Sequence, residues 1–214
     1  MQHLKTVTIA ACSTLALVQV ALADGTAQTT FGGAYIGVQI GHDSVNSDTT
    51  WTDGVDTVVI DGLAGNGLQG GGFAGYGWVN NDTYFGLEAF ASVSEASFSA
   101  SLSSLGSTET EMGFSYGVAA RGGYIVNPNT MLYARASVLT TNFEQSLSGG
   151  SSGDENLTGF GIGAGVEVAV WPKGTLRLEY NFVSYESYQQ SYLGVTETDE
   201  GDNNNVSLGL AFRL

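Results

Sequence analysis

One short segment carries the residue types of a hydrolytic site, since His42 is followed by Asp43 and Ser44. Hydrolases with a serine nucleophile use such a set, with a histidine as base and an acid that orients it. Successive residues of an extended strand point to opposite faces, so three consecutive residues are poorly placed to act together. We therefore expect His42 to be a non-catalytic histidine at the outer end of a strand. Catalysis by this segment remains the alternative.

Acidic residues gather in four segments that contain no lysine or arginine: residues 43–66, 97–110, 143–157 and 186–203. The last includes Asp199, Glu200 and Asp202, whose carboxylates are the hard oxygen ligands that Ca²⁺ and Mg²⁺ prefer. Their spacing does not match an EF-hand loop, so the metal signal is weak. We expect hydrated surface segments and no cofactor, with a divalent-cation site as the alternative.

Glycines alternate with other residues at positions 159, 161, 163 and 165. A dinucleotide-binding glycine loop needs a strand before it and a helix after it, and no helical pattern follows these glycines. Small residues that line one face of a strand explain this spacing better than a nucleotide site does.

The remaining charges of interest interrupt otherwise neutral segments. They are Glu88, Arg121, Arg135, Glu167, Arg177, Glu179 and Arg213. Five of them lie about five to seven residues from the nearest short turn: Glu88, Arg121, Arg135, Glu167 and Glu179. With a rise of about 3.3 Å per residue along a strand, they lie at one level of a barrel. Opposite charges in a poorly hydrated interior must pair, because a lone buried charge is costly. We expect a structural plug of ion pairs, with a selectivity ring or gate as the alternative.

The elements that carry these charges alternate large apolar and small or polar residues. Alternation over four to eight residues is typical of a half-buried strand. It occurs eight times, at residues 36–41, 74–78, 85–93, 114–124, 132–138, 161–170, 176–182 and 206–214. The large apolar set contains no charge in any of the eight segments, whereas the other set is mainly Gly, Ser and Ala. The pattern favours an apolar face toward lipid and a small polar face toward a narrow lumen. A soluble ligand-binding barrel such as a lipocalin is the less favoured interpretation.

Connection lengths agree with a transmembrane barrel. Short turns at residues 80–83, 127–130 and 171–174 alternate with the four longer acidic segments, and both prolines lie in those turns. Bacterial outer-membrane barrels place short turns in the periplasm and long loops outside. The sequence therefore predicts an all-β fold, an eight-stranded antiparallel up-and-down transmembrane β-barrel with both termini periplasmic. Two aromatic girdles are expected: Tyr76, Trp78, Phe85, Tyr124, Trp171 and Phe212 near the turns, and Phe114, Tyr116, Phe143, Phe182 and Tyr185 near the loops.

The first 23 residues have the features of a secretory signal peptide. Lys5 precedes an apolar stretch from Val7 to Val20, and Ala21-Leu22-Ala23 forms a small-x-small cleavage site. A lipoprotein signal ending at Cys12 is the alternative. Cleavage after Ala23 leaves residues 24–214 as the barrel domain, without cysteine and with the net charge changed from −15 to −16.

Composition excludes other classes of protein. Only six Lys and Arg oppose 21 Asp and Glu, so the chain lacks the basic surface that nucleic acid requires. Hydrophobic residues make up 43% of the chain, which is enough for an ordered fold. The 31 glycines disfavour a helical bundle.

Several segments, taken in order, resemble strands of the small porin-like outer-membrane β-barrel proteins of Gram-negative bacteria, which are similar to the barrel domain of outer-membrane protein A. They are Gly32–Val38, Gly71–Trp78, Gly86–Glu88, Gly163–Glu167, Leu178–Tyr180 and Val206–Leu214. That family usually ends in an aromatic residue, whereas this chain ends in Leu214 with Phe212 two places earlier. The resemblance implies insertion by the barrel-assembly machinery and contact with lipid and lipopolysaccharide.

We expect a monomeric, non-enzymatic outer-membrane protein that supports envelope structure and presents acidic loops at the surface, with a surface ligand that the sequence does not identify. A small porin that passes small solutes is the first alternative, although a narrow eight-stranded barrel leaves little room for a channel. A lipid A-modifying enzyme is the second alternative.

Overall fold

Strands make up nearly all of the structure, which is a computed structural model. It describes residues 30–52, 57–102, 106–147, 152–186, 188–192 and 195–214, and it describes side chains at 30–46, 65–97, 112–143, 156–186 and 201–214. The predicted signal peptide, residues 1–23, lies outside these ranges. Within the part of the chain described, no helix is long and apolar enough to cross a membrane.

The strands follow one another in up-and-down order. They are β1 (Gly33–Thr52), β2 (Thr57–Asn80), β3 (Thr83–Ser94), β4 (Ser97–Leu102), β5 (Gly106–Asn127), β6 (Thr130–Leu147), β7 (Ser152–Trp171), β8 (Gly174–Tyr185), β9 (Tyr188–Tyr192) and β10 (Val195–Arg213). β4 continues the course of β3 and pairs with β5, and β9 follows β8 and pairs with β10. The barrel wall therefore contains eight strands.

All pairings in the wall are antiparallel, and the sheet closes on itself. Around the barrel the order is β1-β10-β8-β7-β6-β5-β3-β2, and β2 pairs again with β1. Ile36 shows the closure, because it lies opposite Phe212 on one side and Ala74 on the other. A closed sheet leaves no unpaired edge along the wall. The predicted eight-stranded antiparallel barrel is confirmed.

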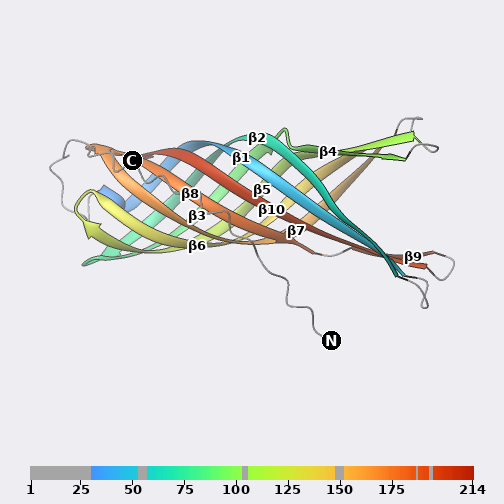
Figure 1. The fold of residues 1–214 in the computed structure, drawn as a ribbon. Coiled ribbons are helices and arrows are strands. Elements are labelled where there is room, and N and C mark those ends of the chain that lie inside the picture. The colour runs from blue at the N-terminus through green and yellow to red at the C-terminus, as the bar shows by residue number, and fades with distance from the viewer. Residues whose placement is uncertain (1–29, 53–56, 103–105, 148–151, 187, 193–194) are drawn as a thin grey trace.

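Short turns close one end of the barrel, and we call it the turn end (Figure 1). Asn81 in the first turn has a φ of 53°, in the left-handed region that asparagine tolerates better than most residues. Each turn also contacts the next strand around the barrel. The carbonyl oxygen of Asp82 accepts a hydrogen bond from the Ile125 amide at 2.7 Å, and those of Asn129 and Lys173 accept bonds from Ala169 and Arg213.

At the opposite, outer end, strands run well past the limits expected from sequence (Figure 1). The segments predicted as loops at 43–66 and 186–203 are largely strand, with β1 paired to β10 as far as Thr52 and Thr196. Residues 97–102 and 106–110 also pair with each other. The loop prediction was wrong in extent because these segments contain many Thr, Val, Tyr and Trp residues, which favour extended backbone.

The outer face of the wall is apolar, as predicted. Ile40, Leu68 and Ile162 are each more than 65% exposed, and large apolar residues alternate with buried ones along every wall strand. All six residues of the predicted turn-end girdle face outward. Trp78 stacks on Phe85 there, and Phe114 stacks on Tyr116 nearer the outer end.

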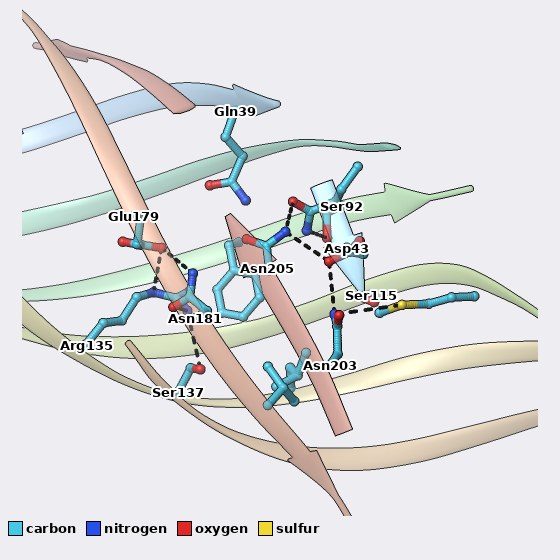
Figure 2. Close-up of a pocket in the computed structure, with 15 residues that line it drawn as sticks. Gln39, Asp43, Ser92, Ser115, Arg135, Ser137, Glu179, Asn181, Asn203 and Asn205 are labelled. Carbon is cyan, nitrogen blue, oxygen red and sulfur yellow. Dashed lines mark hydrogen bonds and ion pairs between the residues drawn. The ribbon is translucent and has the colours of Figure 1, made fainter. Parts of the chain in front are cut away.

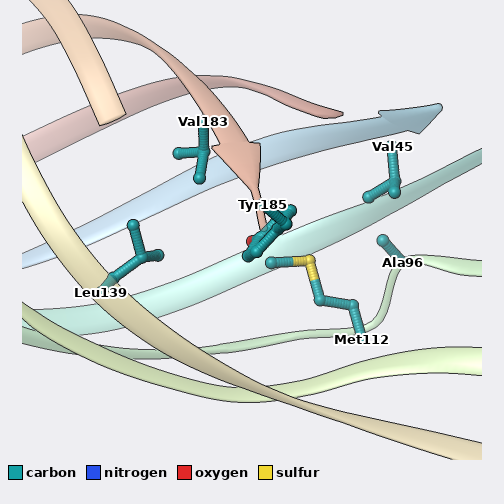
Figure 3. Packing of buried hydrophobic residues seen from close by; sticks show 6 residues of the cluster. All are labelled: Val45, Ala96, Met112, Leu139, Val183 and Tyr185. Carbon is teal, nitrogen blue, oxygen red and sulfur yellow. The ribbon is translucent and has the colours of Figure 1, made fainter. Parts of the chain in front are cut away.

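The lumen contains far more apolar volume than the sequence suggested. An outer apolar cluster consists of Val45, Ala96, Met112, Leu139, Val183 and Tyr185 (Figure 3). A turn-end apolar cluster consists of Phe31, Tyr84, Ile125, Met131 and Tyr133. Two residues assigned to the outer girdle, Phe143 and Tyr185, belong inside: Tyr185 is buried, and the Phe143 ring meets it edge to face at 5.4 Å. Both were assigned outward from residue type, although Phe143 alternates in phase with Arg135 on β6 and Tyr185 with Arg177 on β8, which places them inside.

Candidate functional site

The seven charged residues expected in the lumen all point into it. Glu88 comes from β3, Arg121 from β5, Arg135 from β6, Glu167 from β7, Arg177 and Glu179 from β8, and Arg213 from β10. None is more than 8% exposed. Each occupies a position between two lipid-facing residues of its strand, so the period of the strand directs it inward. We call this set the lumen charge network.

Two glutamates are the centres of the lumen charge network. Glu167 accepts a hydrogen bond from Arg121 Nη2 at 2.6 Å on one oxygen, and bonds from Arg213 Nη2 at 2.8 Å and Thr175 Oγ1 at 2.7 Å on the other. Glu88 accepts a bond from Arg177 Nη1 at 2.7 Å, and the Tyr35 hydroxyl donates to the same oxygen at 3.1 Å. Both carboxylates are therefore fully engaged by cationic and neutral donors.

Glu179 is the third acidic member and is held mainly by neutral donors. The Tyr133 hydroxyl and the Asn181 amide each donate to it at 2.8 Å. Arg135 lies at 3.7 Å from Glu179 and 3.9 Å from Glu88, and its Nη1 donates to Asn181 Oδ1 at 3.2 Å. Arg135 therefore links the Glu88 and Glu179 parts of the lumen charge network.

These ion pairs join strands that are not neighbours in the wall. β3 and β8 lie four strands apart around the barrel, so the Arg177–Glu88 pair crosses the full lumen. Arg121 on β5 and Arg213 on β10 each reach Glu167 on β7, two strands away. Ion pairs between opposite sides of the wall fill the lumen and hold those sides at a fixed separation.

Every arginine of the lumen charge network also stacks on an aromatic ring. The guanidinium carbon lies 3.5 Å from the Phe73 ring centre for Arg177 and 3.9 Å from the Tyr133 ring centre for Arg121. Arg135 lies over Phe90 and Arg213 over Tyr35. A planar guanidinium can stack on a ring and form ion pairs in its own plane, which a lysine ammonium cannot do.

Glycines on the inner face make room for these bulky groups. A Cβ at Gly163 would collide with Asn181 and the Tyr180 carbonyl, one at Gly165 with the Tyr133 ring, and one at Gly209 with Arg177. The alternating glycines of β7 are thus lumen residues that create space for the network, as the sequence indicated.

A buried carboxylate outside the predicted network is Asp43, which the sequence placed in an exposed acidic loop. That placement was wrong: Asp43 lies on β1 inside the barrel and is 0% exposed. Ser94 Oγ donates to one of its oxygens at 2.6 Å. The Asn203 and Asn205 amides donate to the other at 2.9 Å (Figure 2). β1 continues past the predicted boundary, so its alternation directs Asp43 inward.

Asp43 also balances the charge of the lumen. The lumen charge network has four arginines and three glutamates, so it carries one excess positive charge. Asp43 supplies the matching negative charge, and both Asp43 and Arg135 line a cavity of about 40 Å³. Figure 2 shows that Gln39, Ser92, Ser115 and Asn205 surround the same space. A polar cavity of this size holds a few water molecules at most.

The residues considered for catalysis and for metal binding do not form a site in the described structure. His42 is exposed on the lipid-facing side of β1, whereas Asp43 is buried on the other face. The side chains of Asp199 and Glu200 lie outside the described residues, and Asp202 is only partly buried. Among the side chains described, no group of three or more His, Cys, Asp or Glu residues could hold a metal ion.

Sequence reasoning found the charged residues but missed Asp43 and the outer and turn-end apolar clusters. Phe31 is fully buried at the turn end, just ahead of β1, and Arg213 Nε donates to the neighbouring Thr30 carbonyl at 3.2 Å. Alternation does not extend to residues before a strand, so only proximity in the fold could reveal this contact. Tyr133 and Met131 alternate in phase with Arg135, and Tyr84 alternates in phase with Glu88, which were available signals for the turn-end cluster.

A closed antiparallel barrel with an apolar outer wall and paired charges inside defines a transmembrane β-barrel. The chain belongs to the outer membrane protein beta-barrel domain family, whose model matches residues 8–213. The family resemblance found in the sequence is therefore confirmed, and so is the outer-membrane location.

Two relatives are also outer-membrane proteins. The "22 kDa outer membrane protein" of Rhizobium leguminosarum bv. viciae is 32% identical over 141 residues, which cover 65% of this chain and 63% of that protein. The "25 kDa outer-membrane immunogenic protein" of Brucella canis is 26% identical over 121 residues, covering 56% and 55%. The chain thus spans less than two thirds of either relative. Among solved structures, Neisserial surface protein A has a TM-score of 0.48 and 16% identity, over 83% of this chain and 97% of that one.

Proposed function

We propose that this protein is a non-conducting, non-enzymatic barrel whose roles are envelope structure and presentation of its outer segments at the cell surface. The observation that carries the proposal is the filling of the lumen along its length. The outer apolar cluster, the lumen charge network and the turn-end apolar cluster follow one another along the barrel axis.

The lumen charge network and the two apolar clusters oppose conduction for different reasons. Paired charges that cross the lumen obstruct the path and bind one another, and the apolar clusters disfavour water and ions on either side. A polar cavity between the network and the outer apolar cluster has a volume of only about 40 Å³. A solute channel requires continuous aqueous space, so this arrangement supports a closed lumen.

The non-enzymatic assignment rests on how the polar side chains are used. The buried carboxylates Glu88, Glu167, Glu179 and Asp43 accept hydrogen bonds from neighbouring side chains within the barrel. His42, a residue type that often acts as a general base, lies on the outer wall away from them. Among the described side chains, such an arrangement stabilises the structure and supports a non-catalytic role.

The proposal includes an orientation and a set of partners. The short turns face the periplasm, the extended hairpins face outward, and the C-terminal segment Val206–Leu214, which contains the end of β10, is presented to the barrel-assembly machinery. The wall contacts membrane lipid, the outer rim contacts lipopolysaccharide, and the barrel is a monomer. The Brucella canis relative is named an immunogenic protein, which supports surface exposure of this kind of barrel.

Planar-bilayer recording tests the closed lumen directly. The purified mature protein should insert without stepwise conductance under conditions in which a reference porin of known conductance shows clear steps. Reproducible steps from the folded, heat-modifiable protein would refute the closed lumen and establish the small porin instead.

Epitope insertion tests the orientation. A tag between β1 and β2, at residues 53–56, should bind antibody on intact cells, whereas a tag at Asn81 in the β2–β3 turn should bind only after the outer membrane is permeabilised. The reverse labelling pattern would overturn the orientation.

A further inference from the structure

The lipid-facing wall is bulky at most positions but has a hollow on β2 and β3. Gly72 lies opposite Ala91 in the paired strands, and Ala74 lies opposite Ala89, so four small residues form one floor. On one side Val38 and Ile36 of β1 flank this floor, and on the other side Tyr116 and Val118 of β5 flank it. A Cβ on Gly72 would meet only the Gly37 carbonyl, at 3.5 Å, so the space above this residue is open.

The hollow belongs to a groove of about 800 Å³ that runs obliquely across the wall. Trp171, at the turn end of β7, marks its start, and the groove continues past Phe212 and Ile36 to Gly72 and Ala91. Strands in such barrels are tilted by about 35–45°, so a row of paired residues climbs from the turn end toward the middle of the wall. The groove thus begins at the turn-end girdle and ends near mid-membrane.

Water and a second copy of the chain are poor occupants of this groove. Apart from the Trp171 indole, its lining side chains are apolar or glycine, so water would find almost no hydrogen-bond partner there. A two-fold symmetric dimer places the same surface of each copy against the other. Two hollows facing each other would enlarge the empty space rather than fill it.

The surroundings identify a better occupant. The groove is continuous with the lipid-facing wall of an outer-membrane barrel, so hydrocarbon already covers its rims. Unfilled apolar space forfeits the van der Waals contacts that a close-packed surface makes. A single flexible acyl chain can follow an oblique groove, and Trp171 at its entrance is the kind of residue that lies at the headgroup level.

We propose that this groove is a binding site for one acyl chain of a phospholipid from the leaflet at the turn end. The chain enters beside Trp171 and Phe212 and lies over Gly72 and Ala91. The choice of phospholipid over lipid A rests on the periplasmic orientation of the turns proposed above. The small residues of the floor are thereby assigned a recognition role on the lipid side, distinct from the inner glycines that accommodate the lumen charge network.

Two matched variants test the site. Gly72→Leu fills the groove without a backbone clash, and Gly122→Leu adds the same side chain on β5, where a Cβ meets nothing within 4 Å. Full-length mature protein is titrated with palmitoyl-oleoyl phosphatidylethanolamine in detergent, and native mass spectrometry counts the lipids retained. Retention of one lipid should be about tenfold weaker in Gly72→Leu than in wild type, the order expected from about two methylene groups losing their buried contact. Gly122→Leu should retain it as wild type does.

Three results would overturn the proposal: equal retention by wild type and Gly72→Leu, displacement of the phospholipid by an equal amount of lipid A, or a cross-linked dimer that Gly72→Leu abolishes. Heat-modifiability on gels shows that both variants are folded, so a loss of lipid cannot be mistaken for a loss of structure. Conductance is recorded on the same preparations, and its absence would leave the closed lumen standing even if the lipid site failed.

Discussion

Removal of the Arg121 side chain tests whether the lumen charge network holds the barrel together. Its guanidinium donates to Glu167 at 2.6 Å, lies 3.8 Å from Glu88 and covers the Tyr133 ring at 3.9 Å. Alanine at this position leaves Glu167 with Arg213 as its one remaining arginine partner and opens a cavity between the rings. Loss of one partner of a buried ion pair costs about 3–5 kcal/mol, so we expect Arg121→Ala to lower the free energy of unfolding by about 4 kcal/mol.

Two further single variants and their combination separate the effect of charge from the effect of packing. Arg121→Met keeps much of the buried volume but removes the charge, and Glu167→Gln removes the opposite charge. If the pair is coupled, the double variant should lose about 1–3 kcal/mol less than the sum of the two single losses. Strict additivity would mean that the two residues act independently, in conflict with their contact.

Unfolding in urea, with the protein in lipid vesicles, gives these energies from tryptophan fluorescence, and heat-modifiability on gels gives an independent reading of the folded fraction. Lys173→Ala is the matched control, because Lys173 is a basic residue exposed in a turn, and such changes usually stay within about 0.5 kcal/mol. An unfolding free energy for Arg121→Ala within that same range of wild type would refute the structural role of the network.

Two substitutions in the barrel interior and removal of divalent cations give three further predictions. Asp43→Ala should lower the unfolding free energy by about 2–3 kcal/mol, measured as above, because it leaves the Asn203 and Asn205 amides without their charged acceptor; stability equal to wild type would contradict the buried placement of Asp43. Gly163→Val should cost about 1–3 kcal/mol by overpacking against the Tyr180 carbonyl, whereas Gly122→Val on the lipid face should be neutral; equal effects would contradict the assignment of inner and outer faces. Removal of Ca²⁺ and Mg²⁺ with EDTA should leave the melting temperature of the detergent-solubilised protein unchanged if the acidic outer segments are simply hydrated, and a clear decrease would indicate bound cations.

Local patterns were sufficient for the wall. Alternation along residues 85–93 and 206–214 gave both the strand and its lipid-facing side, because one side of each strand must meet hydrocarbon and charges are expelled from it. The same alternation directed Glu88 and Arg213 inward. Short turns with Pro or Asn at 80–83, 127–130 and 171–174 fixed which strands are neighbours.

Local patterns were insufficient at strand ends and outside the strands. β1 was expected to stop near Gly41, so Asp43 was assigned to a solvent-exposed loop instead of the lumen. Tyr185 and Phe143 were assigned to the outer girdle from residue type, although they pack inside the barrel. Aromatic side chains suit both a membrane interface and a packed interior, so residue type alone cannot choose between them.

The amino-acid sequence by itself determined the class of fold, the number of wall strands and the seven inward charges, because each of these follows from the two-residue period of a strand and from what lipid tolerates. Only the tertiary structure decided which charges meet. The Arg177–Glu88 contact joins residues 89 positions apart on opposite walls, and it exists because closure of the sheet and the stagger of its strands bring them to one level. Stagger is a property of the whole closed barrel, and no single strand encodes it.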